Sequence, residues 1–156
     1  TSFIKAIFPE GADKIEAEEI SNSYCPGDYD LSIDGKKFAG IAQRKIKEAV
    51  VVSIYISIFG DQQKRANIMK DFYEIGIDDQ EVRYKYPKVD PECMETLENL
   101  LNKKFTLEDV FERVEKVLYD LDCDLEKGEY TEAMVEEYNE IFEQAKERNE
   151  SYLEGK

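Results

Sequence analysis

The sequence of 156 residues contains no histidine. Histidine is the most common activator of serine and cysteine nucleophiles, and it is a frequent zinc ligand. Its absence excludes a Cys–His or Ser–His pair within the chain and argues against a zinc site. A nucleophile here has to be activated by lysine, by backbone dipoles or by a group on the substrate.

Cysteines are few, and long apolar runs are absent. The three cysteines have unrelated spacings, which predict neither a disulfide framework nor a metal cluster. Free thiols are typical of a reducing compartment, so we expect a cytoplasmic protein. No apolar run approaches the roughly 18 residues of a membrane span, and no signal peptide is visible, so we expect no membrane partner.

The formal net charge is −15, and the acidic excess is concentrated after residue 90. Nucleic-acid binding depends on basic residues that neutralise phosphates, so this composition argues against a nucleic-acid partner. One segment departs from the acidic background. It contains five basic residues and no acidic one: Lys36, Lys37, Arg44, Lys45 and Lys47.

Residues 1–90 have mainly the patterns of β-strands. The stretch "DYDLSID" alternates, Asp34-Gly35 is typical of a two-residue hairpin turn, and "KKFAGIA" is the expected return strand. The stretch "AVVVSIYISIF" also alternates, and we expect it to be a central strand. After Gly60-Asp61 a helix is predicted, with Arg65, Ile68, Met69 and Phe72 on one stripe.

Residues 91–156 have the patterns of helices. Asp90 with Pro91 predicts one helix start, and Thr106 predicts another helix, which we expect to end at Gly128. Thr131 predicts the start of the last helix. The fold class is therefore α+β: a mixed or antiparallel sheet with packed helices in residues 1–90, followed by a helical lobe in residues 91–156.

Cys25 is a candidate nucleophile. It lies between "SNSY" and Pro26-Gly27, ahead of a predicted strand and away from any apolar stripe. A thiol in such a loop, with lysines returning across the hairpin, has the chemistry to attack an acyl carbonyl. The alternative is a loop cysteine without a role.

Two further features allow both a functional and a structural interpretation. Lys36 and Lys37 point to opposite faces of their strand, so only one of them can bind a carbonyl oxygen in a given site. The alternative is a pair of lysines that protects a sheet edge. Gly40 marks either a β-bulge or the close approach of a ligand or another backbone.

The spacing Asp120-x-Asp122-x-Asp124 resembles the start of a calcium-binding loop. Leu125 stands where that loop needs glycine, and Thr131 stands where it needs glutamate. We therefore expect no metal site and interpret the triplet as the polar end of an amphipathic helix.

The stretch "YCPGDYDLSIDGKKFAGIAQRK" closely resembles the central segment of the superfamily of lipoate–protein ligases, octanoyltransferases and biotin ligases. Within it, "CPGDYDLSI" resembles the branch of octanoyl-[glycine cleavage H protein]:protein N-octanoyltransferases. The resemblance implies the C-terminal part of the biotinyl/lipoyl protein ligase fold. The chain begins with Thr1 and lacks the N-terminal half of that family, so we expect it to be part of a longer polypeptide.

The resemblance also implies roles for individual residues. Within "GKKFAGIA" it identifies Lys37 as the lysine that contacts the acyl group, and in "YCPG" it identifies Cys25 as the nucleophile. Four neighbours in the same segment are implied to bind substrate: Gly27, Asp28, Gly40 and Ala42.

The implied reaction moves an octanoyl group from octanoylated glycine cleavage H protein to the lipoyl domains of 2-oxoacid dehydrogenase complexes, through a cysteine thioester. It requires no cofactor, ATP or metal. The basic residues Arg44, Lys45 and Lys47 are a possible docking site for these acyl carriers. Two alternatives are an ATP-dependent lipoate–protein ligase and a non-catalytic fragment or binding module.

Overall fold

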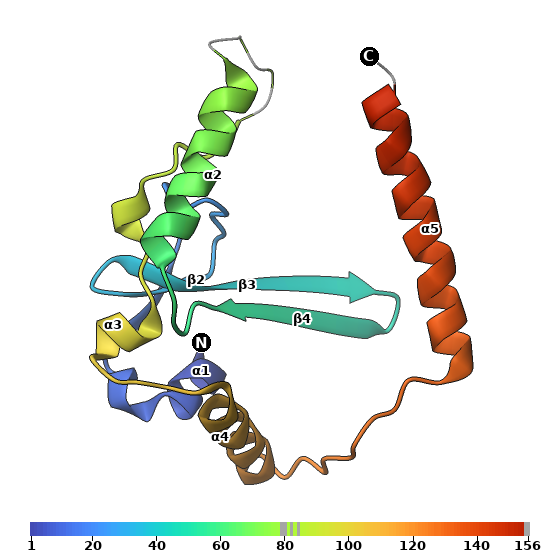
Figure 1. Ribbon diagram of the computed structural model, residues 1–156. Coiled ribbons are helices and arrows are strands. Elements are labelled where there is room, and N and C mark those ends of the chain that lie inside the picture. Colours follow the sequence, from blue (N-terminus) through green and yellow to red (C-terminus); the bar gives the residue numbers. More distant parts are fainter. Residues whose placement is uncertain (79–80, 82, 84, 155–156) are drawn as a thin grey trace. The chain divides into compact units, whose positions relative to one another are not determined.

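The computed structural model describes residues 1–78, 81, 83 and 85–154 (Figure 1). Contacts divide the chain into two units, Thr1–Asp122 and Cys123–Lys156, and each is described by itself. The first unit contains a four-stranded sheet and packed helices, and the second contains one long helix. The predicted α+β class is confirmed.

The sheet is antiparallel throughout, with its strands in sequence order. The strands are β1 (Ile15–Glu18), β2 (Asp30–Ile33), β3 (Lys36–Ile46) and β4 (Ala49–Ile56). The predicted hairpin between β2 and β3 is confirmed. Asp34 and Gly35 have φ angles of 52° and 73°, which are the positive values that a tight two-residue turn requires.

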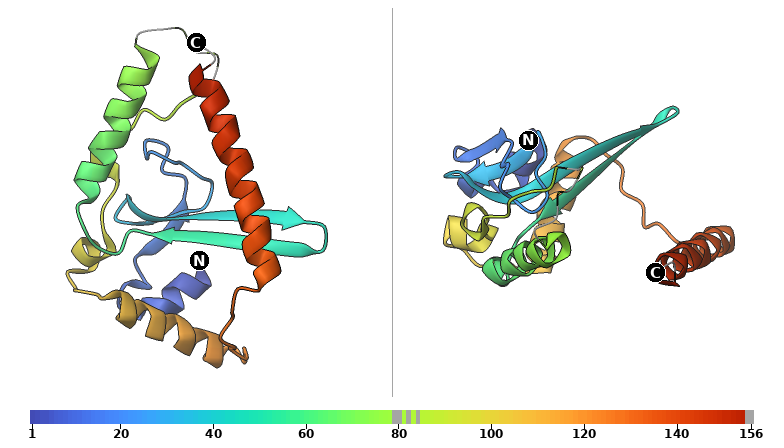
Figure 2. Two further views of the ribbon diagram at one scale, coloured as in Figure 1. Left: turned by 45° about the vertical axis from the view of Figure 1, so that its right-hand side comes forward. Right: turned by 90° about the horizontal axis from the view of Figure 1, so that it is seen from above.

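The β3–β4 hairpin extends beyond the other two strands (Figures 1 and 2). Val50, Val51 and Val52 are each about half exposed, although apolar residues on both faces are typical of a buried strand. The prediction that this strand is central is wrong within the described chain, because β4 forms the edge of the sheet. Alternation reports which side chains are apolar, whereas strand order depends on long-range pairing.

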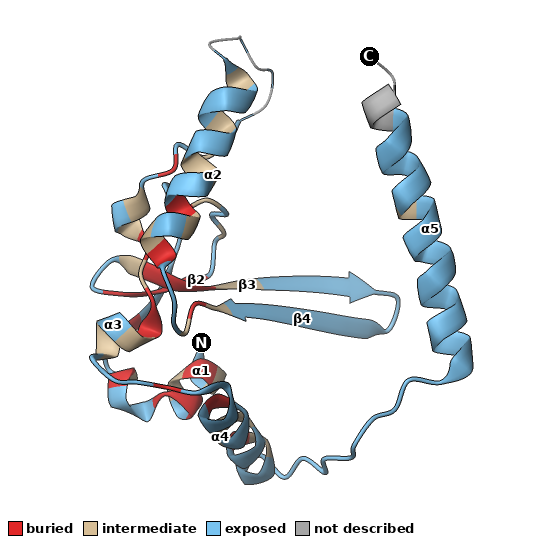
Figure 3. Cartoon of the chain, in the orientation of Figure 1, coloured by how far each residue is buried: buried red, intermediate tan, exposed pale blue. Residues whose placement is uncertain are grey.

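The core lies where β2 and the start of β3 meet the helices α1 (Ser2–Ile7) and α4 (Leu107–Asp120) (Figure 3). The capping box that begins α4 is present: Thr106 N donates to Asp109 Oδ2 at 2.8 Å, and Asp109 N donates to Thr106 Oγ1 at 3.1 Å. The buried members of the core are Ile4, Ile7, Phe8, Ile15, Leu31, Ile33, Phe38, Ala39, Leu97, Phe105, Val110 and Val117.

Helix α2 (Gln62–Ile77) follows β4 as predicted, but it buries a different face from the expected one. Gln62 and Ala66 are buried, whereas Ile68 and Phe72 of the predicted stripe are exposed. The buried face carries Gln62, a polar residue that takes part in a hydrogen-bond network. Apolar periodicity alone does not predict such a face.

The helix expected to begin at Pro91 is divided into two short segments, η2 (Pro91–Cys93) and α3 (Leu97–Leu101). Between them the chain is extended, because Met94 forms a parallel bridge with Lys37 and Glu95 N donates to the Lys37 carbonyl at 3.0 Å. Pairing with β3 therefore replaces helical hydrogen bonds here. The domain boundary expected near residue 90 remains a prediction.

Helix α4 ends at Asp120 and not at Gly128 as expected, because Asp122 takes a positive φ of 55°. In the second unit, α5 (Glu132–Glu154) begins after Thr131 as predicted, and Met134 N donates to the Thr131 hydroxyl at 3.3 Å. In the part of the chain that the structure describes, no helix is both long enough and apolar enough to cross a membrane.

An ion pair connects the N-terminal segment to α4. Arg113 donates to Glu10 Oε2 at 3.0 Å, to Glu10 Oε1 at 3.1 Å and to the Ile7 carbonyl at 3.1 Å. The side-chain hydrogen bond from Arg113 lowers the pKa of Glu10 from 4.5 to about 2. Glu10 therefore stabilises the folded state at pH values above 4.5, and this contribution is lost as the pH falls towards 2.

We expect Glu10→Gln to lower the melting temperature by about 3 °C at pH 7, and the difference from wild type to shrink on acidification below pH 4.5. Thermal unfolding followed by circular dichroism over this pH range measures it. Glu115→Gln, an exposed change on α4, is the control. A difference that stays constant down to about pH 2.5 would show that the Glu10 ion pair does not contribute to stability.

Candidate active site

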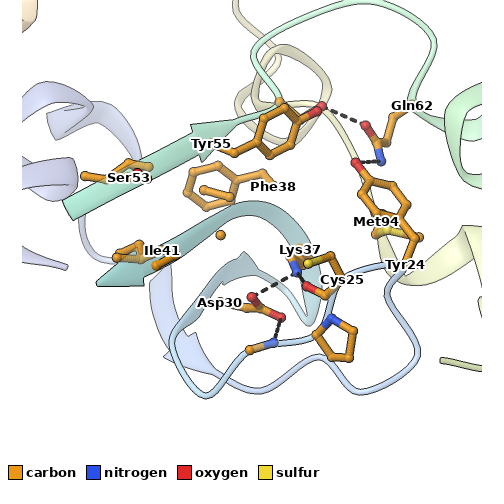
Figure 4. A pocket seen from close by; sticks show the side chains of 17 residues that line it. Tyr24, Cys25, Asp30, Lys37, Phe38, Ile41, Ser53, Tyr55, Gln62 and Met94 are labelled. Atoms are coloured by element: carbon orange, nitrogen blue, oxygen red, sulfur yellow. Dashed lines mark hydrogen bonds and ion pairs between the residues drawn. The ribbon is translucent and has the colours of Figure 1, made fainter. Parts of the chain in front are cut away.

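A cavity of about 650 Å³ lies beside the start of β3, the end of β4 and the loop that precedes β2 (Figure 4). Its walls are mainly apolar and include Phe38, Ile41, Ile54, Tyr55 and Met94. Polar groups converge where the loop reaches the cavity. An apolar volume with a few convergent polar groups is typical of a ligand-binding site.

Cys25 lies in the loop between β1 and β2, and its exposed side chain lines this cavity. The loop turns into β2 through the Asp30 N–H, which donates to the Gly27 carbonyl at 3.2 Å. Figure 4 shows Cys25 and Lys37 at the same end of the cavity. The other two cysteines are elsewhere. Cys93 is partly buried, and burial raises the pKa of its thiol. Cys123 lies in the second unit.

Lys37 is the lysine that the fold directs into the cavity. It is only 7% exposed, whereas its neighbour Lys36 does not line the cavity, as strand alternation requires. The Lys37 ammonium lies 2.9 Å from Asp30 Oδ1. It also donates to Ser23 Oγ at 3.0 Å and to the carbonyl oxygen of Cys25. These contacts use all three N–H groups of the ammonium and connect it to the Cys25 loop.

Asp30 was not among the residues predicted for the site, yet it is central to the polar cluster. It begins β2 and is 2% exposed. Its Oδ1 pairs with Lys37, and its Oδ2 accepts the N–H groups of Gly27 at 3.2 Å and Ile20 at 3.4 Å. The available signal was a charged residue at the start of a predicted strand. The structure shows that β2 is buried on both faces, so this charge needs a partner.

A β-bulge determines which residues of β3 face the cavity. Lys37 pairs with Ser32 while Ala39 pairs with Leu31, so Phe38 is an extra residue on β3. On an uninterrupted strand, residues 37 and 40 would point to opposite faces. The bulge shifts the alternation and brings both to the same site.

Gly40 leaves open the space in front of the Lys37 ammonium. A Cβ at this position would lie 3.7 Å from Asp30 Oδ1 and 3.8 Å from Lys37 Nζ. Gly40 itself pairs regularly with Tyr55, so the bulge is not located at this glycine. Of the two interpretations of Gly40, the geometry supports the close approach of another group.

The structure brings five of the six predicted site residues together at the cavity: Cys25, Gly27, Lys37, Gly40 and Ala42. Asp28 does not line the cavity. A substrate-binding role for Asp28 remains a prediction.

A second polar network, which the sequence did not indicate, borders the same cavity. Gln62 Nε2 donates to the Tyr24 hydroxyl at 3.4 Å, and Ser57 Oγ donates to Gln62 Oε1 at 2.8 Å. Arg65 Nη2 completes the chain by donating to Ser57 Oγ at 2.8 Å. Burial raises the pKa of Tyr24, which directly precedes Cys25 in the loop. The first turn of α2 is thereby connected to the Cys25 loop through Tyr24.

Comparison with curated proteins finds relatives along nearly the whole chain. An octanoyl-[GcvH]:protein N-octanoyltransferase of Lysinibacillus sphaericus is 41% identical over 97% of this chain and 54% of its own length. One from Staphylococcus aureus is 38% identical, with the same two coverages. A lipoyl-[GcvH]:protein N-lipoyltransferase of Listeria monocytogenes is 38% identical over 97% of this chain and 55% of its own length.

The chain spans about half the length of these curated relatives. Residues 3–119 match the family model described as the lipoyl protein ligase A/B catalytic domain. This range contains the sheet, the cavity, Cys25 and Lys37. The chain therefore belongs to the lipoyl protein ligase A/B catalytic domain family.

Proposed function

We propose that the protein containing this chain is an acyltransferase of lipoate assembly that forms a thioester on Cys25. The observation that carries the proposal is the contact between the Lys37 ammonium and the Cys25 loop at the polar end of an apolar cavity. The cavity walls suit a medium-length acyl chain, and the ammonium suits its carbonyl oxygen. The names of the octanoyltransferase relatives support octanoyl as the acyl group and H protein as its donor.

In the first half-reaction, the Cys25 thiolate attacks the carbonyl carbon of the octanoyl-lysine amide. A C–S bond forms, the C–N bond breaks, and the donor lysine leaves as an amine. The proton released by the thiol balances the proton that this amine takes up. Lys37 stabilises the negative charge on the acyl oxygen during the attack.

In the second half-reaction, the lysine amine of a lipoyl domain of a 2-oxoacid dehydrogenase complex attacks the thioester. A new amide forms, and Cys25 is released as a thiol. Two easier steps thus replace one direct exchange between amides, without ATP or metal. The reaction needs Cys25 reduced, in keeping with a cytoplasmic location.

One observation favours a second acyl group, because the Listeria relative is named as a lipoyltransferase. An ATP-dependent ligase is the alternative within the family. It would join the free acid to the acceptor without covalent use of Cys25. A non-catalytic binding module would show neither activity.

The carriers are proposed to dock on Arg44, Lys45 and Lys47. These residues are exposed towards the tip of the β3–β4 hairpin, at the far end of the strand that begins with Lys36 and Lys37. Clustered positive charge accelerates encounter with an acidic partner and makes binding sensitive to salt.

We expect octanoylated H protein to leave one octanoyl group on the protein, in a bond that hydroxylamine breaks. Intact mass after acid quench measures it, on the longest natural polypeptide that contains this sequence. Cys25→Ser should carry no adduct, whereas Cys123→Ser, which removes an exposed cysteine outside the cavity, should resemble wild type. Product that requires ATP and survives Cys25→Ser would favour the ligase instead.

We expect Gly40→Ala to slow thioester formation by about 100-fold, because its methyl group occupies the space in front of the Lys37 ammonium. The added carbon makes only ordinary contacts with neighbouring atoms, so the melting temperature should not fall. Gly76→Ala on α2, where nothing lies within 4 Å of the added carbon, is the matched control. A rate within threefold of wild type would argue against an acyl oxygen bound at this position.

We expect the combined variant Arg44→Glu, Lys45→Glu and Lys47→Glu to raise the KM for the donor about tenfold, because it removes the positive charge that would attract an acidic carrier. The KM should also depend less on salt concentration than it does in wild type. Steady-state kinetics at several salt concentrations measures both. A control with the same charge change places glutamate at the exposed positions Lys14, Lys64 and Lys116. An unchanged KM in the hairpin variant would show that the carriers dock elsewhere.

A further inference from the structure

The carboxylate of Asp30 contacts Lys37 and the backbone of the loop that carries Cys25, the two residues to which the proposed function assigns a role. Oδ1 lies 2.9 Å from the Lys37 ammonium. Oδ2 accepts the Gly27 N–H at 3.2 Å, two residues after Cys25 in the chain, and the Ile20 N–H at 3.4 Å. One buried side chain therefore holds the lysine with one oxygen and the Cys25 loop with the other.

Burial makes the two charges of this arrangement depend on each other. A charged group removed from water is stable only with an opposite charge and enough hydrogen bonds beside it. Asp30 is 2% exposed and Lys37 is 7% exposed, so each is the counter-charge that the other requires. Among the described residues, no buried side-chain nitrogen or oxygen lacks a hydrogen-bond partner.

The three acceptors of Lys37 differ in strength. Asp30 is ionic, whereas Ser23 Oγ and the Cys25 carbonyl are neutral acceptors. All three bonds are charge-assisted because the donor is an ammonium, but only the contact with Asp30 joins two opposite charges, so its attraction is the largest of the three. An acyl oxygen that enters the site therefore replaces a neutral acceptor, while the contact with Asp30 persists and keeps the ammonium in position.

We propose that Asp30 is the positioning residue of this site: it fixes the Lys37 ammonium and the Cys25 loop relative to each other. The inference rests on the proposed function for its kinetic consequence. Asp30 does not act on the substrate itself. It acts through Lys37 on the acyl oxygen and through Gly27 on the loop that carries the thiol.

The kinetic test uses a double-mutant cycle of Asp30→Asn and Lys37→Met in the longest natural polypeptide that contains this sequence. We expect Asp30→Asn to slow thioester formation at saturating octanoylated H protein by about 100-fold, with the donor KM within threefold of wild type. Added to Lys37→Met, the same change should cost far less than 100-fold, because the part of its effect that passes through Lys37 is already lost and only the part that passes through Gly27 remains.

Asp34→Asn is the matched control, since it makes the same chemical change at an exposed turn residue with a positive φ that asparagine tolerates. It should stay within twofold of wild type. Thermal unfolding of every variant identifies loss of fold. If a single variant is too unstable because it leaves one buried charge unpaired, the exchange measurement described below is made on the double variant, which removes both charges, and is compared with wild type.

A second readout does not need activity. Hydrogen–deuterium exchange at the Gly27 amide should become at least tenfold faster in Asp30→Asn but not in Asp34→Asn, because only the former weakens the acceptor of this N–H. Unchanged exchange overturns the inference, and so do multiplicative rate losses in the cycle. If wild type forms no thioester, the proposed function fails, and the exchange measurement alone decides whether Asp30 anchors the loop.

Discussion

The ion pair between Asp30 and Lys37 is the interaction on which the geometry of the site depends. Its two side chains come from neighbouring strands that a two-residue turn connects, so the hairpin brings them together. Once buried, each charge requires the other, and the remaining oxygen of Asp30 requires backbone donors. The donors are Gly27 and Ile20, in the loop that carries Cys25. The position of the loop is thus a consequence of satisfying a buried carboxylate.

The β-bulge at Phe38 solves a second problem, which is that β3 serves the core and the site at once. Phe38 and Ala39 are buried in the hydrophobic core, while Lys37 and Gly40 meet at the polar end of the cavity. A regular strand has only two faces in strict alternation, and it would separate these last two residues. One extra residue places a lysine and an open space on the same side.

The features that the sequence predicted well are those with local causes. The hairpin at Asp34-Gly35 requires two positive φ angles, and the helix start at Thr106 requires a hydroxyl and a carboxylate three residues apart. Both requirements lie within a few residues. Cys25 and Lys37, which both line the cavity, were also proposed from a short stretch, because they stand in a segment that resembles a known family.

The features that the sequence missed depend on contacts between distant segments. The β4 strand has the composition of a central strand, but its place at the edge depends on pairing. The helix predicted from Pro91 is interrupted because Met94 bridges to Lys37, which is far away in the chain. Asp30 is a different case, because its partners Gly27, Lys37 and Ile20 lie only three, seven and ten residues away. The sequence alternation did not show that β2 is buried on both faces, and this burial is what makes the carboxylate need partners.

Because the chain contains no histidine, the proposed reaction depends on Lys37, held by its ion pair with Asp30, to stabilise negative charge. An ammonium with all three N–H groups donated has no lone pair, so Lys37 in this state stabilises negative charge and does not accept a proton. The thiol of Cys25 is exposed to solvent, so water is within reach as an acceptor of its proton. A Cys–His site combines proton transfer and charge stabilisation in one pair, whereas in the proposed reaction Lys37, fixed by Asp30, supplies the charge stabilisation and the exposed thiol can lose its proton to solvent.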